Sequence, residues 1–204
     1  MTVETTFKEW RSALAIYKDR RLLVILLMGF SSGLPLLLGF STLSYWLKAE
    51  GVSLTTIGWF LGVSTPYSLK FLWAPVFDHV RVFALTKRFG QRRSWLLVLQ
   101  PLLSLSIFSV GMSDPKDGLI YMSVATLIMA FLSASQDVVV DAYRIEILDE
   151  SEMEQGAGSS ATQVGYRVGL LVSGAGAIAF SDYFSWDIVY AVMGTLMLVG
   201  IITT

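Results

Sequence analysis

Long apolar runs separated by short polar segments dominate this chain. Each run approaches or exceeds the roughly 18 residues that a helix needs to cross a hydrocarbon core about 30 Å thick. The runs predict spans at residues 22–47, 56–77, 95–112, 119–143, 157–180 and 187–204. The pattern therefore predicts an all-α integral membrane protein. We expect six transmembrane helices forming one bundle over residues 22–204, preceded by a cytoplasmic segment, residues 1–21.

Composition supports a membrane protein and excludes several kinds of chemistry. Hydrophobic residues make up 54% of the chain and charged residues 15%, against about 25% charged in a soluble domain. The chain has no Cys and a single His, His79, which argues against disulfides, thiolate nucleophiles and His-based metal sites. We therefore expect no metal, no cofactor and no enzymatic activity.

The distribution of basic residues predicts an orientation. Segments on the N-terminal side of the six spans hold eleven Lys and Arg, whereas the opposite side holds two. Because cytoplasmic loops carry the excess of basic residues, the N-terminus is predicted to be cytoplasmic.

Ionisable residues interrupt the fourth predicted span. Asp137, Asp141 and Arg144 are spaced four and three residues apart, so they share one helical face, flanked by Gln136. A charge near the bilayer centre costs roughly 2.5–3.5 kcal/mol, so such groups usually face a partner or a wet cavity. The alternative is that Asp141 and Arg144 only fasten this span to the neighbouring loops.

The first span contains Ser31, Ser32 and Pro35 near its middle, between Gly29 and Gly33. Because proline cannot donate a backbone hydrogen bond, we expect a kink or local unwinding at Pro35. Two interpretations stay open: the glycines allow a neighbouring helix to approach, or a freed carbonyl and the serine hydroxyls face a substrate path.

Two cations lie inside other spans. Lys70 either faces inward or extends along the helix to the membrane surface, and its depth matches that of Asp137, so an ion pair between them is geometrically allowed. Arg167 lies close to the midplane of the fifth span, where an arginine needs a partner.

Small residues recur at four-residue intervals in two spans. Gly58 and Gly62 predict close contact of the second span with a neighbour. A longer ridge, Gly165, Gly169, Ser173 and Ala177, predicts a packing seam along the fifth span.

Five motifs, taken together and in order, resemble the AmpG family of muropeptide permeases, within a frame similar to the N-terminal half of a major facilitator superfamily transporter. They are Gly29-Phe30-Ser31-Ser32-Gly33-Leu34-Pro35, Lys70-Phe71-Leu72-Trp73-Ala74-Pro75 with Asp78, Gly90-Gln91-Arg92-Arg93-Ser94-Trp95, Ser133-Ala134-Ser135-Gln136-Asp137 with Asp141-Ala142, and Gly165-Tyr166-Arg167-Val168-Gly169.

The resemblance implies two three-helix inverted repeats and a proton-driven importer of anhydro-muropeptides in the bacterial inner membrane. It implies a second six-helix half, which transport requires and which this chain does not supply. An acetyl-CoA carrier is a related alternative, and a non-transporting membrane scaffold is another if the chain is naturally half-length.

The resemblance also implies roles for single residues. Ser31, Ser32, Pro35, Ser135 and Gln136 would line the substrate path. Of these, Ser32, Ser135 and Gln136 would hydrogen-bond sugar hydroxyl and acetamido groups. Lys70 or Arg167 would attract a substrate carboxylate, and Asp137 or Asp141 would carry the proton. The loop and gating residues would be Asp78, Gly90, Arg92, Arg93 and Arg144.

Overall fold

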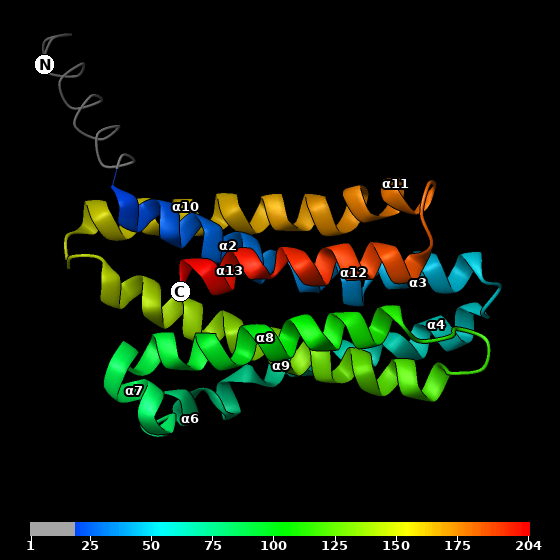
Figure 1. Ribbon diagram of the computed structural model, residues 1–204, viewed down its shortest axis with the longest axis horizontal. Helices are drawn as coiled ribbons and strands as arrows, with labels where there is room; N and C mark the ends of the chain where they lie inside the picture. Colours follow the sequence, from blue (N-terminus) through cyan, green and yellow to red (C-terminus); the bar gives the residue numbers. More distant parts are fainter. Residues whose placement is uncertain (1–18) are drawn as a thin grey trace, which may run out of the picture.

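A computed structural model of the protein describes residues 19–204, in which every regular element is helical (Figure 1). In this part of the chain, five stretches are long and apolar enough to cross a membrane, judged by length and composition. They are α2 (Arg20–Gly39) with α3 (Ser41–Ala49), α8 (Gln91–Gly111), α9 (Leu119–Ile147), α10 (Glu152–Leu171) with the π-helical turn η3 (Val172–Gly176) and α11 (Ala177–Ser181), and α12 (Trp186–Leu196) with α13 (Leu198–Thr203). The predicted all-α architecture is confirmed. The predicted segment of residues 1–21 lies almost wholly outside the described residues.

The second predicted span, residues 56–77, folds as a succession of short helices instead of one long helix. These are α4 (Leu54–Phe60), η1 (Leu61–Ser64), α5 (Thr65–Leu69), η2 (Lys70–Leu72) and α6 (Ala74–His79), followed by α7 (Phe83–Phe89) in the polar linker. Pro66 and Pro75 each lie in the first turn of a piece, where a proline costs no backbone hydrogen bond. Residues 19–204 therefore contain five long helical stretches and one segmented stretch where six long helices were predicted.

The interruption expected at Pro35 falls elsewhere. Helix α2 continues past Pro35 and breaks only at Phe40, whose backbone angles (φ −117°, ψ −91°) are not helical. Beside the break, the Tyr190 hydroxyl donates to the Leu38 carbonyl at 2.8 Å. The Thr42 hydroxyl donates at 2.7 Å to a carbonyl in η3, so irregular turns of two neighbouring helices are hydrogen-bonded to each other.

Glycines hold α2 and α10 in backbone contact, which confirms the predicted seam. A Cβ built on Gly165 would lie 1.9 Å from the Leu26 carbonyl oxygen, and one on Gly169 would lie 2.4 Å from that of Phe30. Glycines of α2 play the reciprocal part: a Cβ on Gly33 would lie 2.2 Å from the Tyr166 carbonyl oxygen. Any larger residue at these positions would push the two helices apart.

The same expectation is not met for Gly58 and Gly62 within residues 19–204. A Cβ at either position would meet no atom of this part of the chain within 4 Å. Both glycines lie in the segmented stretch, at exposed positions. Small-residue spacing alone therefore did not identify which helix face is packed.

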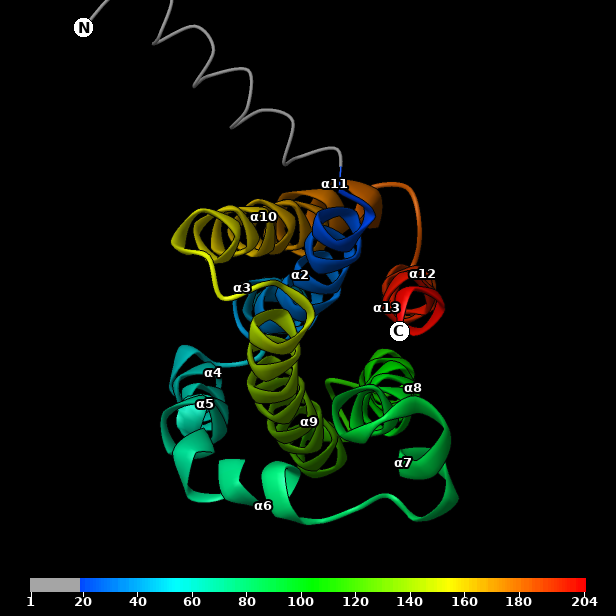
Figure 2. The ribbon, with the colours of Figure 1, turned by 90° about the vertical axis from the view of Figure 1, so that its left-hand side faces the viewer.

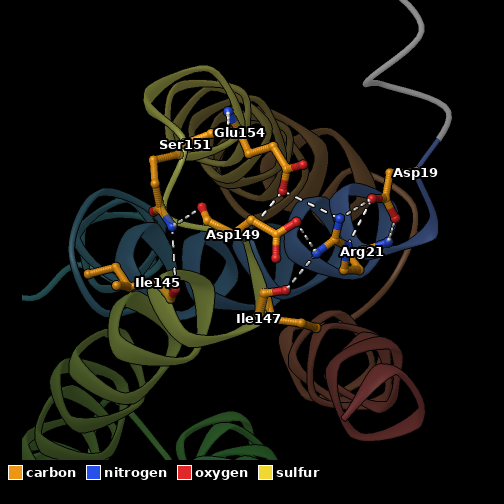
Figure 3. A network of polar contacts seen from close by, with 8 residues as sticks. Asp19, Arg21, Ile145, Ile147, Asp149, Ser151 and Glu154 are labelled. Atoms are coloured by element: carbon orange, nitrogen blue, oxygen red, sulfur yellow. Dashed lines mark hydrogen bonds and ion pairs between the residues drawn. The ribbon is translucent and has the colours of Figure 1, made fainter.

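One end of the bundle is tied together by a polar network around Arg21 (Figure 3). Its guanidinium pairs with Asp19 at 2.8 Å and Glu154 at 3.3 Å, and donates to the Ile147 carbonyl at 3.2 Å. The side-chain hydrogen bond from Arg21 holds the pKa of the Asp19 carboxyl below its ordinary value. The network fixes the start of α2 against the connection between α9 and α10.

Aromatic residues pack at the opposite end. The rings of Trp46 and Trp186 stack with centroids 5.5 Å apart, and Tyr190 lies 5.4 Å from Trp46. Nearby, Lys116 and Glu50 form an ion pair at 3.3 Å between two loops. Both ends of the bundle are thus held together by contacts between α2 or α3 and other helices and loops. A polar cavity lies between these two ends.

Candidate functional site

A polar cavity of approximately 210 Å³ lies where α2, η2, α9 and α10 meet. In the end-on view of Figure 2, α9 lies near the middle of the bundle, with α2 and α10 above it and the short helices of the segmented stretch to its left and below. The lining residues are Ser32, Lys70, Asp137, Val140, Asp141, Thr162, Gln163 and Tyr166. The cavity brings together parts of the first, second, fourth and fifth predicted spans.

The two carboxylates enter the cavity because they are one helical turn apart on α9. Lys70 reaches the same cavity from the segmented stretch, so of the two orientations left open by the sequence the structure has the inward one. Among the ion pairs of residues 19–204, none joins Lys70 to Asp137 or Asp141. The Oδ1 atom of Asp137 is buried without a hydrogen-bond partner, which marks a site able to receive a proton or a polar ligand.

Gln136 lies directly behind the cavity wall. It is fully buried, and its Nε2 donates to the Ser32 hydroxyl at 3.4 Å. Its Oε1 has no partner within the described part of the chain. Gln136 therefore orients Ser32, while Ser32 itself lines the cavity.

Three other predicted residues are buried away from the lining. The Ser31 and Ser135 hydroxyls each donate to a carbonyl one turn earlier on their own helices, at 3.2 Å and 2.7 Å. Ser135 also accepts a hydrogen bond from the Trp73 indole at 3.1 Å, which links α9 to the segmented stretch. Pro35 is buried within α2 and does not line the cavity.

Arg167 lies outside the cavity. Its side chain is exposed on α10 and forms no ion pair or hydrogen bond with residues 19–204. Each residue of a helix turns by about 100°, so the adjacent Tyr166 enters the cavity while Arg167 points away. The partner that we expected for Arg167 is absent from the described residues.

The predicted loop residues form a bridge at one end of α8. Arg92 donates to Asp78 at 2.5 Å and to Glu146 at 2.8 Å, which joins α6 to the end of α9. Gly90 precedes α8 with φ +84°, a left-handed conformation that glycine adopts without strain. Arg92 and Asp78 thus come together as a pair although thirteen residues separate them along the chain.

The other two loop arginines have separate partners. Arg93 donates to the carbonyl of Thr204 at the end of α13. Arg144 donates to the Ser159 hydroxyl on α10. Asp141 lines the cavity instead of pairing with Arg144, so of these two residues Arg144 alone fastens α9 to a neighbouring helix.

Sequence reasoning missed Thr162, Gln163 and Tyr166 of α10, together with Val140. The ridge of small residues at Gly165 predicts a packing seam and does not by itself indicate which side chains face a cavity. Once that ridge is known to contact α2, the residues that flank it must face the space beside α2. That space is the cavity. The sequence alone did not predict how α10 is rotated about its axis, and this rotation decides which of its side chains enter the cavity.

Comparison with known proteins now adds the family. The sequence profile of the acetyl-coenzyme A transporter 1 family matches residues 21–127. The chain belongs to this family. The match runs from α2 into the first part of α9, and so includes Ser32 and Lys70 of the cavity.

Curated relatives confirm the resemblance to AmpG transporters. The anhydromuropeptide permease of Escherichia coli (strain K12) is 40% identical over 94% of this chain. Putative transporter AmpG 1 of Rickettsia felis and AmpG 4 of Rickettsia conorii are 38% and 34% identical, over 90% and 92% of this chain. The chain spans only 38%, 41% and 45% of these three relatives, respectively. They are named as a permease and as transporters, in agreement with a protein that is not an enzyme.

Proposed function

We propose that this chain forms the six-helix half of a proton-driven secondary transporter that imports anhydro-muropeptides across the bacterial inner membrane, with its N-terminus in the cytoplasm. The segmented stretch at residues 54–79 would serve as the sixth span. The proposal rests on one observation above all. A polar cavity with two carboxylates and one ammonium group lies between helices long enough to cross a bilayer.

The lining suits an amino sugar that carries one carboxylate. Ser32, Gln163 and Tyr166 offer neutral hydroxyl and amide groups, and Lys70 offers a single positive charge. The volume of approximately 210 Å³ is below the roughly 300–1,000 Å³ of typical ligand sites. A second six-helix half facing this one would enlarge the site to the size of a disaccharide.

The arrangement of charges suggests how a proton drives uptake. Asp137 and Asp141 repel each other one turn apart when both are ionised, and Lys70 faces the same cavity. A proton on Asp137 would remove its attraction for Lys70 and leave the ammonium group to bind the carboxylate of the substrate. Loss of that proton on the cytoplasmic side would let Asp137 compete for Lys70 and so release the substrate.

An acetyl-CoA carrier is the second candidate, because the matching family profile bears that description. Coenzyme A carries several phosphate charges, which proteins usually bind with clustered Arg and Lys. The cavity instead offers two carboxylates against one Lys. This charge balance favours the muropeptide.

Uptake into cells that lack their own muropeptide permease tests the proposal. The protein is expressed from its natural gene, with any sequence that follows Thr204, and labelled N-acetylglucosaminyl-1,6-anhydro-N-acetylmuramic acid is supplied. We expect uptake that collapses when the proton gradient is dissipated. Uptake of an acetyl-CoA label instead of the disaccharide would favour the second candidate.

The variant Asp137→Asn tests the proton carrier. It should retain binding of the disaccharide but lose gradient-driven uptake, because the amide cannot exchange a proton. Asp117→Asn, in the exposed loop before α9, is the matched control and should transport normally. Unchanged uptake by Asp137→Asn would remove this residue from the mechanism.

A further inference from the structure

Helix α10 presents Tyr166 to the cavity from a fixed position. The backbone carbonyl oxygen of Tyr166 touches α2 at Gly33: a Cβ built on Gly33 would lie only 2.2 Å from this oxygen. Gly165 and Gly169 make the same kind of contact on either side of it along the helix. The seam leaves α10 no freedom to rotate about its axis, so Tyr166 and Gln163 are held facing the cavity.

Most polar side chains of α10 are already engaged within the protein. Ser159 accepts a hydrogen bond from Arg144, and the hydroxyls of Ser160 and Thr162 donate to carbonyls of their own helix at 3.0 Å and 2.9 Å. The Gln163 amide and the Tyr166 hydroxyl form no hydrogen bond with residues 19–204, although both residues line the cavity. Their hydrogen-bonding groups are therefore free for a ligand.

These two side chains offer chemistry that the rest of the lining lacks. A glutamine amide carries both a donor and an acceptor, and so matches another amide with two hydrogen bonds. A tyrosine ring offers a flat apolar face together with a polar tip. A pyranose ring that carries an acetamido group has an apolar C–H face and an amide, which complement both.

We infer that Gln163 and Tyr166 determine the specificity of the site for N-acetylated sugars, and the inference rests on the proposed function. The Gln163 amide pairs with the acetamido group of the substrate. The Tyr166 ring packs against the apolar face of the same sugar. Lys70, which lines the same cavity from the segmented stretch, then serves the carboxylate of the neighbouring sugar.

Competition binding to the purified protein, expressed from its natural gene, tests this assignment. The labelled disaccharide is displaced either by itself or by its de-N-acetylated analogue. Gln163→Leu should weaken binding of the acetylated ligand about three- to tenfold, the effect of losing one or two neutral hydrogen bonds. The same variant should bind the de-N-acetylated analogue as the wild type does, because that ligand lacks the group that Gln163 contacts.

Tyr166 variants separate the ring from its hydroxyl. Tyr166→Phe should keep most of the affinity, whereas Tyr166→Ala should lose on the order of tenfold for both ligands because the stacking surface is gone. Tyr183→Ala, at an exposed position in the turn after α11, is the matched control. Gln163 is exposed in the absence of ligand, so its substitution leaves the packing intact and keeps the test valid if Tyr166→Ala does not fold.

The outcomes separate the inference from the proposed function. A wild-type protein that neither binds nor imports the disaccharide would refute the proposed function. A wild-type protein that binds it, with Gln163→Leu weakening both ligands equally or neither, would refute the inference alone.

Discussion

The glycine seam between α2 and α10 yields a prediction with a magnitude set by the structure. In Gly165→Ala, the new Cβ would lie 1.9 Å from the Leu26 carbonyl oxygen and 2.9 Å from the Phe30 amide nitrogen. Real Cβ atoms do not approach heavy atoms closer than about 3.0 Å, so the two helices must separate by about 1 Å. Both neighbours are backbone atoms of a helix, and neither can move aside alone.

Overpacking of a core costs typically 1–3 kcal/mol, and here the strained atoms belong to the backbone. We therefore expect Gly165→Ala to lower the free energy of unfolding by about 3 kcal/mol, even though alanine favours helices by up to about 1 kcal/mol over glycine. Because the separation moves Tyr166 and Gln163, affinity for the disaccharide should fall as well.

Gly156→Ala is the matched control on the same helix. A Cβ there would meet nothing within 4 Å, so this variant should be as stable as the wild type or slightly more stable. Unfolding of the purified proteins by SDS in mixed micelles measures both. If Gly165→Ala were as stable as the wild type, or if Gly156→Ala were equally damaged, the contact between the two helix backbones would not be as described.

Two further variants test contacts away from the cavity. Arg92→Gln breaks both ion pairs that join α6 to α9. Because the two carboxylate partners are about half exposed, the free energy of unfolding should fall by about 1 kcal/mol, and this loss should shrink at high salt. Equal damage from Arg81→Gln, at an exposed position without such pairs, would contradict this reasoning. Thr42→Val removes a buried donor to the Ser173 carbonyl and should lower the free energy of unfolding by about 1–2 kcal/mol in the same SDS titration. Thr195→Val is the control, because Thr195 is exposed and hydrogen-bonded within its own helix, and it should have no effect. Equal free energies of unfolding for the two variants would show that the hydrogen bond to η3 is not stabilising.

The sequence alone predicted much of the candidate site. Asp137, Asp141 and Lys70 were singled out because a charge inside an apolar run needs a polar environment, and all three line one cavity. Arg167 was chosen by the same rule, yet it faces away from the cavity and has no partner in the described residues. Depth along a helix follows from counting residues, but the direction of a side chain depends on the rotation of the helix.

Breaks in the helices were likewise predicted only in part from the sequence. An interruption of the first span was predicted from Pro35, whereas the division of the second span into short helices, two of which begin near Pro66 and Pro75, was not predicted. In the first span the break is at Phe40 instead of Pro35, next to the bonds made by Tyr190 and Thr42. Those partners lie more than a hundred residues away along the chain, so no local rule could name the position.

The amino-acid sequence by itself determined that this chain is a bundle of membrane helices with rare charges at known depths. It could do so because a bilayer imposes its length and its polarity on each segment separately. The tertiary structure decided which side chains share the cavity: Tyr166 and Gln163 enter it, and Arg167 does not. The physical reason is that contact between the backbones of α2 and α10, made at glycines on both helices, sets the rotation of each, and that contact exists only when the two segments meet.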